Sequence, residues 1–385
     1  MDDDQRFETL AVHAGEQRPG PEGSVVYPIY QGTVYSVESG TAYDDMKYLR
    51  LNSTPSQVYL HGKLAALEGA EAAVATSSGM AAITTTLHTL LKAGDHLIIA
   101  DVLYGGTHDF ITERAEALGW TYTFVDAQRP ETWAAAVTPK TRVFYVETIA
   151  NPLMRVARMP EVVAFSREHG LTSVVDNTFA SPVNYRPIPA GFDVVLHSAT
   201  KSLNGHSDLT AGVVAGSAEL VERVRHVLNL YGGSLDAHPG FLLARGLKTL
   251  ALRVRAQNEN ALAVAGFLAD HPKVAEVNYA GLASHVDHTH ARRFLSGFGG
   301  MLSLRLTGGV DAAEALFDGL RLPHVALSLG GVESLVTRPA LTSHAGMTAE
   351  DRAASGITDD LIRLSCGVEA AEDLVGDFEN ALTKV

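Results

Sequence analysis

Lys201 lies at the end of a predicted buried strand. The stretch VVLHSATK spans residues 194–201, and the apolar run Val194, Val195 and Leu196 predicts a buried strand. Burying the charge of Lys201 at the end of such a strand is costly, so its ammonium either reaches water or is kept there for chemistry. As a free amine, this lysine would be a base and a nucleophile for carbonyl groups.

Other polar side chains also follow predicted strands. TSVVD ends on Asp176, with Thr178 two residues later. VFYVE ends on Glu147, and HLIIAD precedes Tyr104. Since ligands bind beyond the carboxyl ends of the strands in open α/β sheets, we expect these groups to meet Lys201 on one rim.

A predicted helix start supplies a candidate anion site. In TSSGMAA, residues 76–82, Ser78 and Gly79 lead directly into a helix. The first turn of a helix presents free N–H groups and the positive end of its dipole to an anion. A serine at this place is more often a plain N-cap, so the feature gains weight only in combination with Asp176 and Lys201.

That combination matches what pyridoxal phosphate needs. Lys201 would bind the aldehyde of the cofactor, which requires a pKa well below the ordinary value of about 10.4. Asp176 would hold the pyridine nitrogen protonated, which keeps the ring an electron sink, and Ser198 and Thr200 would bind the phosphate. Two alternatives stay open: structural roles for these residues, or a nicotinamide-dependent dehydrogenase, for which no GxGxxG follows a strand.

The predicted elements form an α/β fold. Between about residues 60 and 240, short apolar strands alternate with amphipathic helices, which indicates a mostly parallel sheet with helices on both faces. The predicted strands are HLIIAD, YTFVD, TRVFYVE, TSVVDN and DVVLHS, and the predicted helices span 56–69, 79–94, 107–119 and 159–170. After residue 240, a long helical segment, the strands GMLSLRLTG and LIRLSCG and a closing helix predict a smaller C-terminal α+β domain.

The first 60 residues or so show no helical period. They are rich in Gly, Pro and Tyr and are too aromatic for a disordered tail, so we expect an extended arm that packs against something such as a second subunit.

Composition narrows the class of partner. The 385 residues carry a formal charge of −14, which disfavours nucleic acid and anionic membranes as partners. The N-terminal MDDDQRFETL does not look like a signal peptide, and no apolar run approaches the length of a membrane span, so we expect a cytoplasmic protein.

The single cysteine, Cys366, is expected to pack in the interior rather than to react. His285, His288 and His290 lack the spacing of a metal site, and no metal is expected.

Eight stretches together carry a resemblance over nearly the whole chain: VYPIYQGTVY, LAALEGAEAAVATSSGMAAI, DVLYGGTHDF, VVDNTFASP, HSATKSLNGHSD, GFGGMLSLRL, SLGGVESLVTRPALTSHAGM and GITDDLIRLSCGVE. They resemble the Cys/Met-metabolism pyridoxal phosphate enzymes, which include cystathionine γ-synthase, cystathionine γ-lyase, cystathionine β-lyase and methionine γ-lyase. The resemblance implies a fold type I pyridoxal-phosphate-dependent transferase. It also implies a homotetramer, a dimer of dimers, with active sites shared between subunits.

The implied organisation has three parts. Residues 1–55 would be an N-terminal arm that contacts the neighbouring subunit, residues 56–240 the large cofactor-binding domain, and residues 241–385 the C-terminal α+β domain.

The resemblance also implies a role for each matching residue. Lys201 would be the Schiff-base lysine and proton shuttle, and Tyr104 would stack on the ring and assist proton transfer. The implied cofactor-binding residues are Gly79, Met80, Tyr104, Asp176, Thr178, Ser198, Thr200 and Lys201, together with Tyr48 and Arg50, which match a Tyr-x-Arg that reaches the phosphate of a neighbouring subunit. Arg363 would clamp the substrate carboxylate, and the other implied substrate-binding residues are Asn151, Ser328 and Leu327.

Some positions depart from the family pattern. LNSTPS after the Tyr-x-Arg is one residue longer than usual, and ETIANP keeps Asn151 but has Ile149 and Ala150 before it.

The residue before SLGG differs between members of the family. Members that act on cystathionine by γ-chemistry tend to carry Glu there, one bacterial type of β-lyase carries an aromatic, and methionine γ-lyase carries an apolar residue. This chain has Leu327, which cannot pair with an ammonium and so favours a substrate with an uncharged γ-substituent. Gly106, however, stands where methionine γ-lyases carry a cysteine.

The expected activity is γ-elimination or γ-replacement on a sulfur amino acid or an O-activated homoserine. The alternatives are cystathionine β-lyase-type β-elimination and methionine γ-lyase-like activity. A transaminase and a non-catalytic binding protein are rivals of other classes.

Overall fold

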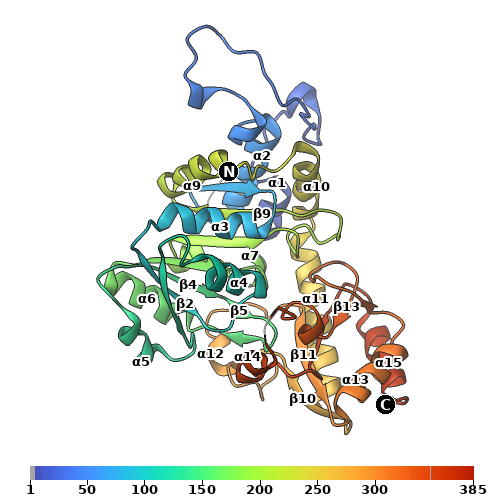
Figure 1. The fold of residues 1–385 in the computed structure, drawn as a ribbon. Coiled ribbons are helices and arrows are strands. Elements are labelled where there is room, and N and C mark those ends of the chain that lie inside the picture. Colours follow the sequence, from blue (N-terminus) through green and yellow to red (C-terminus); the bar gives the residue numbers. More distant parts are fainter. Residues whose placement is uncertain (1–4, 347) are drawn as a thin grey trace.

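The computed structural model describes residues 5–346 and 348–385, so residues 1–4 of the predicted arm lie outside the described residues. Figure 1 shows two parts, each built on its own sheet, with the N-terminal segment in blue at one end. The larger part runs from cyan to yellow-green, and the smaller C-terminal part is orange and red.

A seven-stranded sheet forms the core of the larger part, in the order β1-β9-β8-β7-β4-β2-β3. The strands from β8 to β3 in this order run parallel, whereas β9 is antiparallel to both β1 and β8. Every residue of β2 and β9 is buried, as expected where both faces of a sheet are covered. The strands are β1 (Ala72–Thr76), β2 (His96–Ala100), β3 (Thr121–Val125), β4 (Thr141–Glu147), β7 (Thr172–Asp176), β8 (Val194–Ser198) and β9 (Gly212–Gly216).

Helices cover this sheet, and a small hairpin adjoins its rim. Helix α3 packs on β8 and β9, α2 on β1, and α6 on β7. The helices up to the second part are α1 (Phe7–His13), α2 (Pro55–Glu68), α3 (Gly79–Leu90), α4 (Gly105–Arg114), α5 (Pro130–Trp133), α6 (Met159–His169), α7 (Ser181–Asn184), α8 (Pro187–Ala190), α9 (Ala218–Tyr231) and α10 (Ala237–Leu247). The hairpin pairs β5 (Ile149–Ala150) with β6 (Arg155–Val156).

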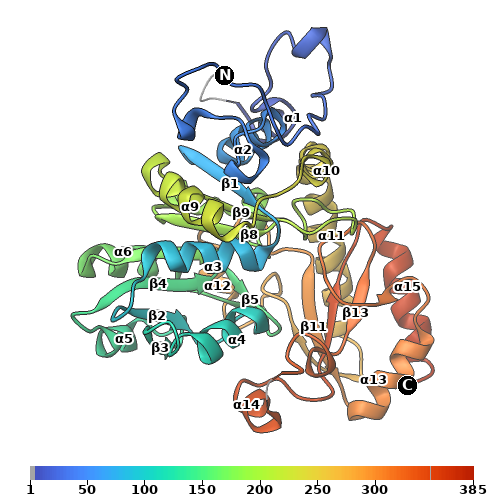
Figure 2. The same ribbon diagram turned by 45° about the horizontal axis from the view of Figure 1, so that its top comes forward.

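The smaller part has a five-stranded sheet in the order β10-β11-β14-β13-β12, with its own cluster of buried apolar side chains. In Figure 2 this sheet stands beside the larger part, with α15 and α13 on its outer side. Its strands are β10 (Val274–Asn278), β11 (Met301–Leu306), β12 (His324–Val325), β13 (Leu335–Thr337) and β14 (Ile362–Ser365). The helices after residue 249 are α11 (Leu250–Ala269), α12 (His288–Ala291), α13 (Gly309–Gly319), α14 (Ala349–Ala354) and α15 (Ala371–Leu382), of which α12 packs against the larger part. Short 3-10 turns lie at Pro21–Gly23, Tyr43–Asp45, Leu49–Leu51, Ala134–Ala136 and Pro339–Leu341.

The predicted fold class is confirmed, and the five predicted strands of the large sheet are present as β2, β3, β4, β7 and β8. Strands β1 and β9 were not predicted, because AAVAT and GVVAG are dominated by small residues that give a weak strand signal. The long helical segment after residue 240 is two helices, since α10 ends at Leu247 and α11 begins at Leu250. The division into three parts at residues 55/56 and 240/241 stays a prediction.

The N-terminal segment is not irregular throughout, which corrects the expectation from its sequence. Helix α1 lies against α2, where the buried Lys63 donates hydrogen bonds of 3.0 Å to the main-chain oxygens of Ala11 and Val12. Further along, the ring of Tyr27 stacks on that of Tyr59 at 4.1 Å. The segment therefore packs partly on its own chain.

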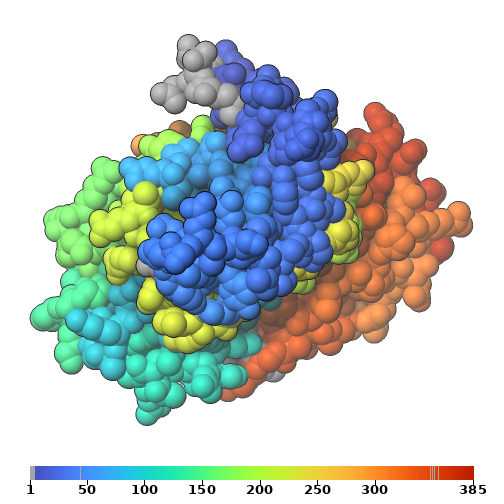
Figure 3. All heavy atoms as spheres, turned by 90° about the horizontal axis from the view of Figure 1, so that it is seen from above, coloured from blue at the N-terminus to red at the C-terminus, as the bar shows by residue number. Residues whose placement is uncertain are grey.

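The remainder of the segment is on the outside of the molecule. Figure 3 shows it in blue, spread across the surface seen from above. Several of its apolar side chains face solvent, with Val25 91% and Val34 75% exposed. Among the helices of residues 5–346 and 348–385, none is long and apolar enough to cross a membrane. The cytoplasmic location stays a prediction.

Candidate active site

A cavity of about 560 Å³ opens where strands β4, β7 and β8 end. It lies between the large sheet and a loop and strand of the smaller part, because its lining includes Lys201 from one side and Arg363 from the other. The structure brings twelve predicted site residues to this cavity: Gly79, Met80, Tyr104, Asn151, Asp176, Thr178, Ser198, Thr200, Lys201, Leu327, Ser328 and Arg363.

Lys201 lies in a tight turn directly after β8, where its N–H donates to the carbonyl of Ser198. Its Nζ donates a hydrogen bond of 2.7 Å to Oγ of Ser328 from the smaller part. Burial, helped by the positive charge of Arg363, lowers the pKa of Lys201 to about 8. The amine is therefore half deprotonated at about pH 8, well below the pH at which an ordinary lysine loses its proton.

Asp176 ends β7 and is 9% exposed. Its Oδ1 accepts hydrogen bonds from both the N–H and the hydroxyl of Thr178, and that hydroxyl oxygen accepts the N–H of Ser198 at 2.8 Å. Burial raises the pKa of Asp176, while the hydrogen bonds from Thr178 act against this rise. A buried carboxylate held in this way is suited to a cationic N–H partner.

The start of α3 forms a cradle beside Ser198. Ser78 caps the helix by accepting the N–H of Ala81 at 3.1 Å. A Cβ on Gly79 would lie 2.8 Å from Cβ of Ser198, so only glycine lets the helix start approach β8 this closely. The Thr200 hydroxyl exchanges hydrogen bonds with the main chain of Ala211, so it would have to turn to donate to a phosphate.

Arg363 on β14 is 4% exposed and borders the same cavity. Its guanidinium donates to Oδ1 of Asn151 at 3.0 Å and to the main-chain oxygen of Ser328 at 3.1 Å, both neutral acceptors. Among the side chains that the structure describes, no carboxylate pairs with it, and burial lowers its pKa to about 10. Such a buried cation is a ready partner for the carboxylate of a ligand.

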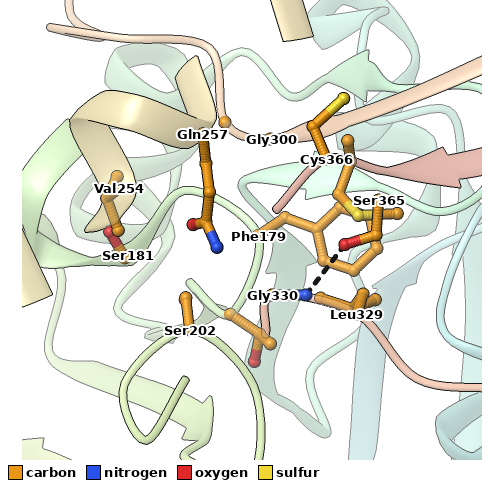
Figure 4. Close-up of a pocket in the computed structure, with 13 residues that line it drawn as sticks. Phe179, Ser181, Ser202, Val254, Gln257, Gly300, Leu329, Gly330, Ser365 and Cys366 are labelled. Carbon is orange, nitrogen blue, oxygen red and sulfur yellow. Dashed lines mark hydrogen bonds between the residues drawn. The ribbon is translucent and has the colours of Figure 1, made fainter. Parts of the chain in front are cut away.

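The loop that carries Ser328 is anchored by hydrogen bonds to neighbouring elements. Ser328 has φ +82°, which is strained for a residue other than glycine. Figure 4 shows the hydrogen bond of 2.9 Å from the N–H of Gly330 to Oγ of Ser365, next to a cavity of about 10 Å³, which is the size of one water. Nε2 of Gln257 donates to the oxygen of Gly331 at 2.7 Å. These bonds tie the loop to β14 and α11.

Two predicted cofactor-binding residues do not reach this cavity. The Arg50 guanidinium lies over the Tyr48 ring and donates to the main-chain oxygen of Asn229 and to the hydroxyl of Tyr43. Both Tyr48 and Arg50 are exposed. Within this one chain neither residue lines the cavity.

The structure also brings to the cavity residues to which the sequence assigned no role. Glu147 at the end of β4 lines its floor, and Asp109 on α4 lines it as well. Thr342 and Ser343 complete one wall. The sequence places Glu147 at a strand end on the same rim as Lys201, without a role, and the structure puts it in the cavity. Asp109 was not predicted, because it lies within a helix whose orientation toward the cavity no local pattern reveals.

Other conspicuous residues serve packing. His288 Nδ1 bonds to the main-chain oxygen of Ala280, and His290 Nε2 to that of Ala157. Cys366 is fully buried, which raises the pKa of its thiol far above the ordinary value. Within the described part of the chain, no group of three His, Cys, Asp or Glu side chains is arranged to hold a metal ion.

Comparison with known proteins identifies the family. The family described as "Cys/Met metabolism PLP-dependent enzyme" matches residues 8–383. The chain belongs to this family. It is a pyridoxal-phosphate-dependent lyase or synthase of cysteine and methionine metabolism.

Relatives in this family cover nearly the whole chain. It is 42% identical over 386 residues to L-methionine gamma-lyase from Pseudomonas putida, covering 98% of this chain and 97% of that protein. It is 40% identical over 378 residues to cystathionine gamma-lyase from Bacillus subtilis, covering 98% and 99%. Among solved structures, cystathionine gamma synthase from Xanthomonas oryzae pv. oryzae, in complex with aminoacrylate and cysteine, has a TM-score of 0.95, 40% identity and coverage of 99% and 98%.

The cavity fits the family's cofactor. Ser198 and the first N–H groups of α3 would hold a phosphate in a space that a side chain on Gly79 would fill. Asp176 is buried and suits a protonated ring nitrogen, and Lys201 has the lowered pKa that bonding to an aldehyde requires.

Uptake of the cofactor is expected to depend on pH. Because only the neutral amine of Lys201 attacks an aldehyde, the rate at which the apoenzyme takes up pyridoxal phosphate should rise with pH through about 8 and then level off. Substituting Arg363→Met removes a nearby positive charge and should move this midpoint to higher pH. Stopped-flow absorbance measures both.

The exposed Lys140→Ala variant is the matched control and should keep the wild-type midpoint. A wild-type midpoint near 10.5, the ordinary value for lysine, would contradict the assignment of Lys201 as a lysine with a lowered pKa.

Proposed function

We propose that this enzyme catalyses γ-elimination or γ-replacement on a sulfur amino acid or an O-activated homoserine. The observation that carries the proposal is the pairing, in one cavity, of the buried Arg363 with the amine of Lys201, joined through Ser328. This arrangement suits an amino acid whose carboxylate is held while a proton is removed beside it.

Arg363 would bind the substrate's α-carboxylate with the two N–H groups of its planar guanidinium. The carboxylate would replace some of the hydrogen bonds that Arg363 now donates to the neutral oxygens of Asn151 and Ser328. It would also neutralise the buried positive charge of Arg363. Because Arg363 lies in a strand, it would fix the orientation of the substrate's Cα relative to Lys201.

Lys201 would move the protons. Its amine, oriented by Ser328, would remove the proton from Cα. Bound pyridoxal phosphate supplies the electron sink that stabilises the negative charge left on Cα, and Asp176 would maintain this by holding the ring nitrogen protonated. A second proton then leaves Cβ and the γ-substituent departs. A thiol adds at Cγ in replacement, or water completes elimination to a 2-oxo acid and ammonia.

The mouth of the cavity favours an uncharged γ-substituent. Leu327 lines it and is 64% exposed, so its side chain offers an apolar contact and no acceptor for an ammonium. A methylthio or acyl group would remove this apolar surface from water at no cost in buried charge.

A second candidate substrate class follows from Asp109. This carboxylate lines the same cavity from α4, and its Oδ2 lies 3.4 Å from the position of a Cβ on Gly346. It would pair with a distal ammonium, as cystathionine carries. Leu327 and Asp109 therefore favour different substrates, and turnover decides between them.

We also propose that Tyr48 and Arg50 complete the site of a second copy of the chain, in a homotetramer built as a dimer of dimers. Among the described residues that line the cavity, the only basic side chains are Lys201 and Arg363, and both are hydrogen-bonded to Ser328. A phosphate at the α3 cradle would benefit from a further cation. Arg50 is exposed on a segment with exposed apolar side chains such as Val34, as expected of a surface between subunits.

A substrate panel tests the proposed reaction. The holoenzyme is incubated with methionine, homocysteine, O-acylated homoserines and cystathionine, and the products are identified by mass spectrometry with and without an added thiol. We expect 2-oxo acids or thiol adducts from the substrates with uncharged γ-substituents and less product from cystathionine. Lys201→Ala should abolish turnover and, after borohydride reduction, retain no covalently bound cofactor.

Faster cleavage of cystathionine than of every other substrate would contradict the role of Leu327. If Asp109→Asn then selectively lost the activity on cystathionine, the second candidate would replace the first. Stable pyridoxamine formation with these amino acids would instead identify a transaminase.

The role of Arg50 has its own test. Arg50→Ala should weaken binding of pyridoxal phosphate by about tenfold, as expected for the loss of one charge-assisted hydrogen bond, while the assembly seen by analytical ultracentrifugation stays a tetramer. Arg142→Ala, an exposed arginine on β4, is the control. Unchanged cofactor affinity in Arg50→Ala would contradict the shared site.

A further inference from the structure

Glu147 is a buried acid at the floor of the cavity that the proposed reaction does not use. It ends β4, is 6% exposed and lines the cavity beside Asp176. Its Oε1 accepts the main-chain N–H of Tyr104 at 2.6 Å. Tyr104 is the residue that precedes α4, so this carboxyl holds the point where the helix starts.

The sheet places the two acids side by side. Glu147 on β4 is in register with Asp176 on β7, and residues in register on neighbouring parallel strands point to the same face of the sheet. Neighbouring strands are about 4.8 Å apart. Two carboxylates this close and this deeply buried cannot both stay ionised without a compensating cation.

The groups around the pair decide which acid carries the proton. Asp176 accepts two hydrogen bonds from Thr178, and such bonds stabilise its charged form. Glu147 faces Asp176 from β7, Tyr145 on its own strand and the main chain of Tyr104 and Asn151, and none of these is a cation. The hydrogen bonds from the main chain of Tyr104 and Asn151 favour the charged form of Glu147, but burial and the charge of Asp176 outweigh them. Among the described residues, no Lys, Arg or His pairs with it, and burial together with the charge of Asp176 raises its pKa well above the ordinary value.

We propose that Glu147 is a positioning residue that works as a neutral carboxyl, fixing Tyr104 through its main-chain N–H while leaving the negative charge of the acid pair to Asp176. This inference rests on the proposed pairing of Asp176 with the ring nitrogen of the cofactor. A neutral Glu147 leaves Asp176 as the only anion of this acid pair, and therefore available to a protonated nitrogen. An ionised Glu147 would instead raise the pKa of Asp176 and disfavour its charged form.

The same carboxyl would also set the ring of Tyr104. A Cβ on Gly106 would lie 2.7 Å from Cε1 of Tyr104, so the ring already lies tightly against the first turn of α4. Holding the N–H at the start of this turn therefore limits where the ring can lie over the cavity. Glu147 thus connects the aromatic residue and the acid that would flank the cofactor.

Two substitutions separate the charge of Glu147 from its hydrogen bond. Glu147→Gln keeps an acceptor oxygen and is neutral, whereas Glu147→Ala removes the acceptor and leaves the N–H of Tyr104 unpaired. We expect Glu147→Ala to lower kcat/KM by about tenfold and to shift the absorbance of the bound cofactor, as for loss of a buried hydrogen bond. Glu147→Gln should restore kcat/KM to within about threefold of wild type and keep the wild-type pH dependence of the cofactor absorbance.

Infrared spectroscopy of the apoenzyme reads the charge state directly and without substrate. The difference spectrum between wild type and Glu147→Gln at neutral pH should show the carbonyl band of one protonated carboxyl. The frequency of this band should shift when the protein is transferred to deuterated water. The exposed Glu113→Gln on α4 is the matched control and should show the loss of an ionised carboxylate instead.

Two results would overturn the inference. One is a difference spectrum in which Glu147 is an ionised carboxylate. The other is a Glu147→Gln holoenzyme whose cofactor absorbance shifts with pH as far as that of Glu147→Ala. Because the infrared measurement needs neither substrate nor cofactor, it stands even if the proposed reaction proves wrong or Glu147→Ala fails to fold.

Discussion

The buried guanidinium of Arg363 is the constraint on which the rest of the cavity depends. Removing this cation from water is expensive, and the partners that the structure gives it, Asn151 and the main chain of Ser328, are neutral. A bound carboxylate would supply the missing charge, so the site is arranged for an anionic ligand before any chemistry begins. The same charge helps to lower the pKa of Lys201, which links recognition of the substrate to the readiness of the base.

Each of the two sheets supplies different residues to the cavity. The parallel strands β7 and β8 end in Asp176 and lead to Lys201, whereas β14 and the loop before β13 supply Arg363 and Ser328. The hydrogen bond from Lys201 to Ser328 spans the junction between the two parts. Because sheet strands and anchored loops are rigid, the distance between substrate carboxylate and base is set by the packing of one part on the other.

Much of this arrangement was predictable from local pattern. Lys201, Asp176 and Gly79 follow strands or begin a helix, and the topology of a parallel sheet brings such positions together. A local sequence pattern does not reveal how neighbouring strands align in register or how closely two segments of the chain approach each other. The pairing of Glu147 with Asp176 depends on how β4 and β7 align, and the need for glycine at 79 depends on its distance from Ser198. Helix α1 is only seven residues long and packs against α2, where Lys63, some fifty residues away, binds its last turn. Such distant contacts leave no local signal, so this helix was not predicted.

The most direct measurement is a spectroscopic titration of the holoenzyme with glycine and with glycinamide, which share the amine but differ in the carboxylate. If Arg363 binds the substrate carboxylate, glycine should perturb the cofactor absorbance with an affinity about a hundredfold or more above that of glycinamide. This preference should disappear in Arg363→Met. Equal affinities for the two ligands in the wild-type enzyme would contradict a carboxylate site at Arg363.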